Sequence, residues 1–241
     1  MKSWGRTVSN LRPQRAVRST FGRMHRRRNV LLFLLTAATL AIPPLLGLLR
    51  LGKLGLHQAV NAEHPSWLDP VMHVSTNVAD GLVPTVVAIL LLLAGRWRQV
   101  LMVGVSAAGS GLLVQLLKRN VFAGSDRPAE FLDRMPEVRL VEGVVLDHHF
   151  SFPSGHAATA FSLCLAMAVI DGRRWTGPFW SMLAAGIAFT RVYLSEHFTG
   201  DILAGGTIGV VVTTGVFLWL YSPRSSDRAW LDRRPLGLFR G

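Results

Sequence analysis

Long apolar segments recur along this chain and constrain its fold more than any other feature. Six can be drawn, covering residues 30–50, 79–95, 99–117, 157–171, 176–194 and 201–221. Several are close to the roughly 20 residues that an α-helix needs to cross a bilayer. In hydrocarbon only helices or closed barrels satisfy the backbone, and these segments are too long and continuous for barrel strands. The sequence therefore predicts an all-α, integral-membrane bundle of six transmembrane helices.

The composition agrees with a membrane protein. Half of the 241 residues are hydrophobic, only 17% are charged, and the mean hydropathy is +0.34. A soluble domain carries about 25% charged residues. The first apolar segment lacks a small-residue cleavage site, so we expect it to be retained as a helix rather than removed as a signal peptide. The domain prediction is one transmembrane domain over residues 29–221, flanked by basic tails at 1–28 and 222–241.

The distribution of basic residues predicts the orientation. Nine of the 26 Lys and Arg residues lie in residues 1–28, and five follow residue 221. With Arg96, Arg98, Arg173 and Arg174, 18 of the 26 fall on the side of the two termini. Because cytoplasmic loops are enriched in Lys and Arg, we expect both termini to be cytoplasmic. The net charge of +12 does not indicate nucleic-acid binding, since no basic patch carries an interleaved aromatic platform.

Three polar clusters interrupt the apolar pattern, and the predicted topology brings all three out on the external side. Each has an ordinary explanation by itself: cations near helix ends reach the headgroups, and a serine or aspartate can cap a helix. Together, three cations and two histidines would form an anion site, and the natural anion at a membrane surface is phosphate. The clusters are Lys118 with Arg127-Pro128, then Pro153-Ser154-Gly155-His156, then Arg191, His197 and Asp201.

The spacing within two clusters suggests specific chemistry. His197 and Asp201 are four residues apart, so the carboxylate can reach the imidazole on one helix face. Such a pair would leave the other ring nitrogen free as a nucleophile toward phosphorus. Ser154 and Gly155 come directly before the fourth apolar segment, where a helix N-terminus would offer free N–H groups to a phosphate.

The three clusters resemble the signature motifs of the type 2 phosphatidic acid phosphatase (PAP2) family, in its membrane-bound lipid phosphatase branch. This family shares its site with the vanadium haloperoxidases. The runs Ser151–Ala160 and Arg191–His197 also read like the family, and the resemblance covers about residues 80–215. Eight residues separate Lys118 from Arg127, two more than is usual in the family, which leaves open whether Lys118 or Arg119 fills the first basic role. Thr190 stands where the family often has Ser.

The resemblance implies a role for each motif residue. His197 would attack phosphorus to give a phosphohistidine, Asp201 would orient it, and His156 would act as general acid and then as general base. The phosphoryl oxygens would be held by Lys118, Arg127, Arg191, Ser154 and the N–H of Gly155. No metal and no cofactor are expected. A metal site of His148, His149 and His156 is disfavoured because no Cys or carboxylate set stands at ligand spacing.

The resemblance thus implies a hydrolase of a lipid phosphate or diphosphate, acting at the outer face of a bacterial inner membrane with its site toward the periplasm. Candidate substrates are undecaprenyl diphosphate, phosphatidylglycerol phosphate, phosphatidic acid and lipid A. A lipid phosphotransferase with the same intermediate remains open, as does a non-catalytic lipid transporter or binding protein. The expected partners are the substrate lipid and the bilayer, and the oligomeric state is left open.

Several other residues receive ordinary interpretations. Cys164 lies in an apolar run and is expected to be a small buried side chain. His57 and His64 are interpreted as surface residues. The charges of the long loop could be specificity contacts to a headgroup, but the preferred interpretation is that they are solvated: Glu130, Asp133, Arg134, Glu137 and Arg139.

Overall fold

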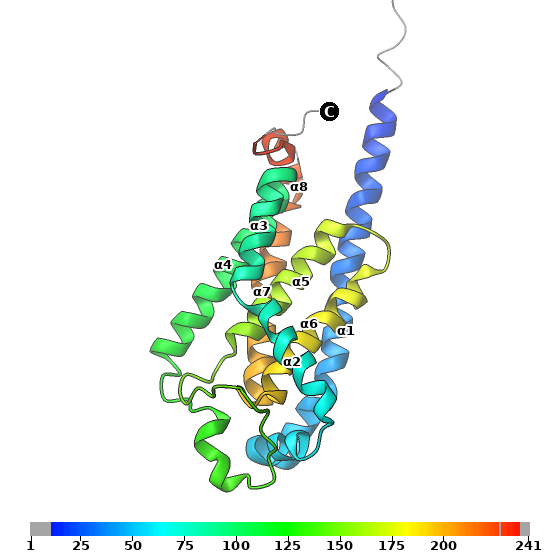
Figure 1. Ribbon diagram of the computed structural model, residues 1–241. Helices are drawn as coiled ribbons and strands as arrows, with labels where there is room; N and C mark the ends of the chain where they lie inside the picture. The colour runs from blue at the N-terminus through cyan, green and yellow to red at the C-terminus, as the bar shows by residue number, and fades with distance from the viewer. Residues whose placement is uncertain (1–10, 227, 237–241) are drawn as a thin grey trace, which may run out of the picture.

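The computed structural model describes residues 11–226 and 228–236, and all regular structure in these ranges is helical (Figure 1). The prediction of an all-α protein is therefore confirmed. The outer parts of the two predicted tails, at 1–10 and 237–241, lie outside the described residues. The helices are α1 (Leu11–Asn61), α2 (Asp69–Thr76), α3 (Leu82–Ala94), α4 (Trp97–Asn120), α5 (Gly155–Asp171), α6 (Thr176–Tyr193), α7 (Thr199–Leu220) and α8 (Pro223–Ser226).

The six predicted apolar segments correspond to α1 and α3 to α7, but they do not all qualify as membrane spans by length and composition. Three do within the described residues: Met24–Asn61 of α1, α4 and α7. A fourth would be the pair Ser66–Ala79 and Leu82–Ala94, which is bent by 52°. The helix α5 is apolar but has only 17 residues.

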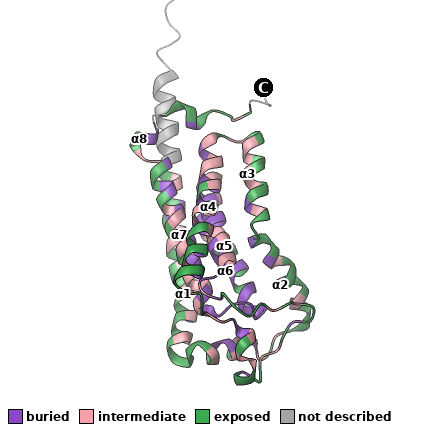
Figure 2. Cartoon of the chain, turned by 90° about the vertical axis from the view of Figure 1, so that its left-hand side faces the viewer, coloured by how far each residue is buried: buried purple, intermediate pink, exposed green. Residues whose placement is uncertain are grey.

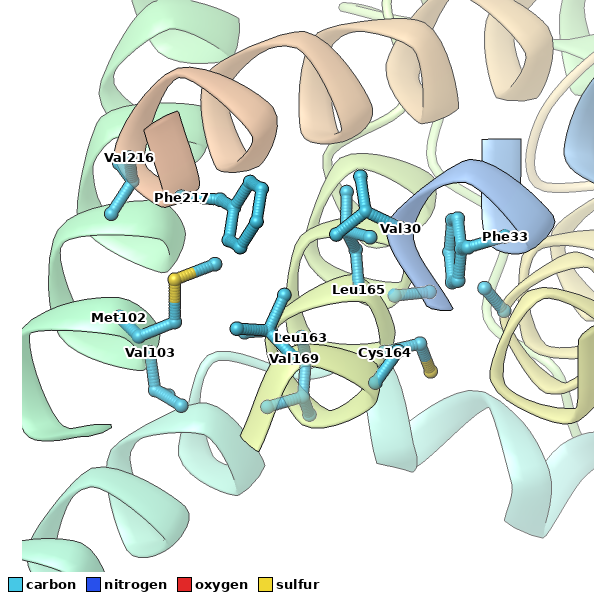
Figure 3. Close-up of a cluster of buried hydrophobic side chains, with 14 of the residues drawn as sticks. Val30, Phe33, Met102, Val103, Leu163, Cys164, Leu165, Val169, Val216 and Phe217 are labelled. Carbon is cyan, nitrogen blue, oxygen red and sulfur yellow. The ribbon is translucent and has the colours of Figure 1, made fainter. Parts of the chain in front are cut away.

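The centre of the bundle is α5, which packs against α1, α4, α6 and α7. Side chains from these helices form the apolar core shown in Figure 3, including Phe33, Met102, Leu165 and Phe217. Cys164 is 3% exposed within this core, so its interpretation as a small buried residue is confirmed. Large apolar side chains also cover the outside of the bundle; Leu49, for example, is 76% exposed. Exposed positions recur along the helices in Figure 2, as expected for a surface that faces lipid.

Glycines let α7 approach α5 closely. A Cβ atom at Gly205 would lie 2.2 Å from the carbonyl oxygen of Ser154, and one at Gly209 would lie 2.4 Å from that of Ala158. Small residues four apart are a common means of close packing between membrane helices. The contact brings the two helix N-termini together, and the Ser154 N–H donates to the carbonyl oxygen of Asp201 at 3.0 Å.

A break at Gly52 redirects the end of α1. Gly52 has φ +69° and ψ −179°, a conformation open to glycine because it has no Cβ. The residues beyond the break reach the end of α6 and the turn that precedes α7: His57 Nε2 lies 3.2 Å from Ser195 Oγ in the turn, and the Asn61 amide donates to the Val192 carbonyl at 3.2 Å. The interpretation of His57 as a surface residue is therefore wrong, because the redirected segment buries it completely.

His64, the other histidine interpreted as a surface residue, is also enclosed. Its side chain is only 6% exposed, and its ring packs against Tyr193 with the centroids 4.1 Å apart. Its Nδ1 lies 3.4 Å from Asp69 Oδ1. The interpretation as a surface residue is wrong here too, because α2 and the end of α6 fold over this part of the chain.

The two ends of the bundle differ in character. At one end, the Arg26 guanidinium lies over the Tyr221 ring at 5.3 Å, and Arg98 pairs with Asp232 at 2.8 Å. The Asn29 amide donates to the Arg173 carbonyl at 2.7 Å at the same end. The turn before α7 and the long loop between α4 and α5 lie at the opposite end, which is the lower end in Figure 1.

Candidate active site

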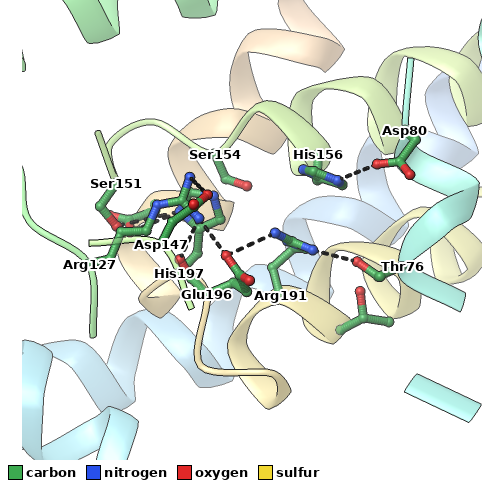
Figure 4. Close-up of polar contacts among 12 residues, drawn as sticks. Thr76, Asp80, Arg127, Asp147, Ser151, Ser154, His156, Arg191, Glu196 and His197 are labelled. Carbon is green, nitrogen blue, oxygen red and sulfur yellow. Dashed lines mark hydrogen bonds and ion pairs between the residues drawn. The ribbon is translucent and has the colours of Figure 1, made fainter. Parts of the chain in front are cut away.

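The three polar clusters of the sequence meet at this lower end of the bundle (Figure 4). Lys118 comes from the end of α4, and Arg127 from the loop that follows it. Ser154 and His156 stand at the start of α5, and Arg191 near the end of α6. His197 lies in the turn before α7, and Asp201 in the first turn of that helix. The fold thus places both histidines within electrostatic reach of the cations.

His197 is held by a carboxylate that is itself fixed. The His197 ring is 1% exposed, and its Nδ1 lies 3.4 Å from Asp201 Oδ2. The same Oδ2 accepts hydrogen bonds from the Ser151 hydroxyl at 2.5 Å and from the Phe198 N–H at 2.9 Å. This arrangement favours the tautomer with its proton on Nδ1, which leaves Nε2 with a free lone pair.

Burial lowers the pKa of His197 to about 3, although the hydrogen bond to Asp201 opposes the shift. The ring is therefore neutral at physiological pH. A neutral imidazole is the form that can act as a nucleophile.

Arg127 and Arg191, here called the arginine pair, converge on one carboxylate oxygen. Arg127 Nη1 lies 2.5 Å from Glu196 Oε2, and Arg191 Nη2 lies 3.2 Å from the same atom. Arg191 also donates to the Thr76 hydroxyl at 2.8 Å, and Arg127 pairs with Asp147 at 3.2 Å. Both guanidinium side chains are about nine-tenths buried, so their orientation is fixed before any ligand arrives.

Lys118 belongs to the cluster, and Arg119 does not. The Lys118 side chain is buried and lies within electrostatic reach of Arg127, Arg191 and Asp201. Among the described residues it forms no ion pair, so its ammonium group is available to an anion. Arg119 is exposed on the other face of α4. The geometry therefore favours Lys118 for the first basic position.

The start of α5 presents open backbone. Ser154 is the N-cap of the helix, and its Oγ accepts from the Ala157 N–H at 3.4 Å. The capping interpretation of Ser154 is thus correct, and its hydroxyl proton remains free to donate to a ligand. A Cβ at Gly155 would meet only Val114, at 3.9 Å. A helix N-terminus with this much space suits an anion.

His156 is paired with a residue far away in sequence. Its Nε2 lies 2.7 Å from Asp80 Oδ1, just before α3. Figure 4 shows His156 on the other side of the arginine pair from Ser151. The ring is within electrostatic reach of both Arg191 and Arg127, and His197 is within reach of Arg127 and Lys118, so the two histidines lie beside one cluster of cations.

Sequence reasoning missed several side chains that order this site. Glu196 was adjacent to His197, and Ser151 lay in the run that resembles the family, so both could have been found by their position. Asp80, Asp147 and Thr76 gave no signal, because their partners lie 20 or more residues away along the chain.

The loop between α4 and α5 is anchored rather than free. Arg139 contacts both carboxylate oxygens of Asp69, at 3.0 and 2.6 Å, and its N–H donates to the Asn61 carbonyl at 2.8 Å. The Tyr193 hydroxyl donates to the same Asp69 at 2.6 Å. The interpretation of Arg139 as a solvated charge is therefore wrong, because the carboxylate on α2 binds it.

Other charged groups of the loop pair at the surface. Glu137 accepts from Gln58 at 3.1 Å, His148 contacts Glu130, and His149 lies 2.9 Å from Asp126. Neither of these histidines pairs with His156. Within residues 11–226 and 228–236, no group of three or more His, Cys, Asp or Glu side chains is placed to hold a metal ion.

Comparison with known proteins adds a family match. A family model described as "PAP2 superfamily" matches residues 99–224. The lipid A 4'-phosphatase of Bacteroides thetaiotaomicron is 40% identical over 60 residues, which are 25% of this chain and 27% of that protein. That of Porphyromonas gingivalis is 30% identical over 98 residues, 40% of this chain and 41% of that protein.

A further relative is the putative undecaprenyl-diphosphatase YbjG of Escherichia coli, 39% identical over 61 residues, 25% of this chain and 30% of that protein. The chain thus spans less than half the length of each of these curated relatives. Among solved structures, the crystal structure of Aquifex aeolicus LpxE has a TM-score of 0.58 and 25% identity, with 68% of this chain and 94% of that chain covered.

Proposed function

This chain is a member of the PAP2 superfamily, and from that we propose that it is a lipid phosphatase, which hydrolyses a phosphomonoester or diphosphate on a lipid headgroup. One observation supports the proposal: the His197–Asp201 pair and the arginine pair lie in one cluster, with His156 beside the same arginines. We take this cluster as the phosphate pocket, because it combines a neutral imidazole, a paired carboxylate and fixed cations, which phosphoryl transfer through a covalent intermediate requires.

In the first step, His197 Nε2 attacks phosphorus while the bond from phosphorus to the leaving oxygen breaks. His156 donates a proton to that oxygen, so the lipid or shorter phosphate leaves as a neutral or less charged group. The Asp201 carboxylate stabilises the positive charge that develops on the His197 ring. The product of this step is a phosphohistidine.

In the second step, His156 acts as base. It takes a proton from water, the resulting hydroxide attacks phosphorus, and the phosphorus–nitrogen bond breaks to release phosphate and restore His197. In both steps Lys118, Arg127 and Arg191 face the phosphoryl oxygens together with the Ser154 hydroxyl and the Gly155 N–H. Donors fixed before the reaction stabilise the charge of the transition state without reorganisation.

The proposal includes a topology of six transmembrane helices over residues 29–221, with both basic tails in the cytoplasm. Its support is the separation of charges: Arg26, Arg98 and Arg173 gather at the end of the bundle opposite the site. The pocket would then open toward the periplasmic face of a bacterial inner membrane, near the headgroups, where a lipid phosphate lies.

The candidate substrates are lipid A and undecaprenyl diphosphate, which the names of the relatives suggest, and phosphatidic acid or phosphatidylglycerol phosphate. Apolar space beside the site supports a lipid. A cavity of about 880 Å³ lies between α1, α6 and α7 and includes Val192 and Thr199, which flank the turn of His197. A second one, of about 490 Å³, lies between α3, α4 and α5 near Gly81 and Thr159.

The test is hydrolysis by the purified protein. In detergent with a chelator, it is presented with each of these lipids and released phosphate is measured, with the His197→Ala variant as control. We expect release from at least one lipid and none from the variant. If no lipid yields phosphate, or if the variant is as active as the wild type, the proposal is wrong. Transfer of labelled phosphate to a second lipid would instead identify a phosphotransferase.

A further inference from the structure

Glu196 lies where the two arginines of the site converge, and neither the motifs nor the two-step reaction gives it a task. One of its oxygens, Oε2, lies 2.5 Å from Arg127 and 3.2 Å from Arg191. The side chain is 8% exposed. Its backbone is fixed as well, because its N–H donates to the Arg191 carbonyl at 2.9 Å and its own carbonyl accepts from Arg127 at 3.4 Å.

A carboxylate oxygen between two guanidinium groups has the same partners that a phosphate oxygen would have. Both are anionic acceptors for charge-assisted hydrogen bonds, which are short and strong. In a buried setting such a carboxylate either competes with phosphate for the N–H donors or repels it from beside them. Burial raises the pKa of Glu196, while the two neighbouring guanidinium groups oppose the rise.

Glu196 reduces the net positive charge of the pocket, and this affects how strongly the pocket would hold phosphate. Without Glu196, the arginine pair and Lys118 would present three buried cations, two of them with fixed orientation. The reaction releases inorganic phosphate, and such a site would retain it. A phosphatase must bind the transition state more tightly than the product. Cations that attract the transition state and free phosphate equally do not raise kcat.

We propose that Glu196 is an internal competitor for phosphate: its carboxylate offsets the arginine pair and keeps the affinity for free phosphate low. This inference rests on the proposed function, since it takes phosphate as the product. Glu196 is a positioning and charge-balancing residue, not a catalytic one, because it acts through the two arginines.

The experiment measures binding of inorganic phosphate directly, without turnover, by isothermal titration calorimetry of the full chain in detergent. Glu196→Gln removes the charge with little change in shape, and we expect it to bind phosphate at least tenfold more tightly. Asp147→Asn is the matched control, since Asp147 also pairs with Arg127 but is 68% exposed, and we expect it to change the affinity less than threefold. Glu196→Asp keeps the charge and should stay nearer the wild type.

A tighter complex in Glu196→Gln alone supports the inference, because a merely structural lesion in the pocket would weaken binding. Unchanged or weaker binding in Glu196→Gln overturns it, as does an equal gain in Asp147→Asn or a failure of every variant to bind phosphate. Thermal unfolding of each variant in detergent identifies a variant that does not fold; if Glu196→Gln does not fold, Glu196→Ala, which also removes the charge, takes its place with the same expected gain in affinity. Lack of hydrolysis by the wild type would contradict the proposed function but would leave the binding result to stand.

Discussion

His156 Nε2 and Asp80 Oδ1 lie 2.7 Å apart, although their positions differ by 76 along the chain. Asp80 precedes α3 and His156 is the second residue of α5, so this pair joins two helices at the border of the pocket. A carboxylate partner fixes the orientation of an imidazole, and the proposed mechanism requires the imidazole of His156 to give and take protons. In that mechanism, the pair would make acid–base catalysis depend on the position of α3.

This relationship predicts how two variants will depend on the leaving group. With an alkyl phosphate, His156→Ala should lower kcat by about 10²–10⁴-fold, the usual contribution of general acid–base catalysis. Asp80→Asn should lower it by a smaller factor, because the imidazole remains but is less well oriented. With an aryl phosphate such as p-nitrophenyl phosphate, the nitrophenolate leaves without needing a proton. Both variants should therefore lose less of the rate at which the phosphohistidine forms, and the burst of nitrophenolate release measures that rate. Equal losses with both leaving groups would contradict the role of His156 as acid.

The lowered pKa of His197 predicts a stability that depends on pH. The folded ring has a pKa of about 3 and the unfolded ring the ordinary value of 6.5, so below about pH 6.5 the unfolded chain binds more protons. The contribution of His197 to stability is therefore complete above that pH and is lost as the pH falls toward the folded pKa. Thermal unfolding in detergent at about pH 7 and about pH 4.5 should show a larger loss of stability for the wild type than for His197→Asn, by about 2–3 kcal/mol. Equal losses would argue against a neutral buried ring.

The close approach of α5 and α7 predicts a difference between two glycines of one helix. In Gly205→Ala the new methyl group would meet the Ser154 carbonyl at 2.2 Å, so the start of α5 must move and the phosphate site with it. We expect at least a tenfold loss of kcat/KM, with a stability loss of about 1–3 kcal/mol from overpacking. Gly215→Ala is the control, since a Cβ there meets nothing within 4 Å. Its activity should equal that of the wild type, and a similar loss in both variants would contradict the packing argument.

The anchored loop predicts where the chain opens when one ion pair is removed. Arg139→Ala breaks the contacts of Arg139 with Asp69, so amides of residues 121–154 should exchange hydrogen faster by mass spectrometry. Arg134→Ala serves as control, because within residues 11–226 and 228–236 Arg134 forms no ion pair and its guanidinium lies over the Phe131 ring at 5.9 Å. We expect little change in that variant. Unaltered exchange in Arg139→Ala would show that Asp69 does not hold the loop.

The helices and the motif residues could be predicted from the sequence because the signals are local. Apolar segments of sufficient length identify α1 and α3 to α7, and the four-residue spacing of His197 and Asp201 identifies their pairing. The number of membrane spans is harder to predict from the sequence, because α5 is short and α3 is bent relative to the helical segment before it. Length and hydropathy do not indicate whether a short helix such as α5, which is buried among the other helices, crosses the membrane.

Contacts between distant segments could not be predicted. Nothing near His57 in the sequence indicates that the break at Gly52 turns it toward Ser195, so its imidazole was interpreted as a surface group. The partners of Arg139 and His156 likewise come from other helices. Glu196 is a different case. Its position next to His197 places it near the site, but only the structure shows that it contacts both Arg127 and Arg191.

The glycine contact between α5 and α7 also bears on how a lipid would reach the site in the proposed function. The Ser154 N–H to Asp201 carbonyl bond ties the start of α5 to the start of α7. Separation of these two helices would break this bond and move Ser154 and His156 away from Asp201 and His197. In the proposed function, a lipid headgroup would therefore enter between other helices of the bundle, with α5 and α7 still in contact.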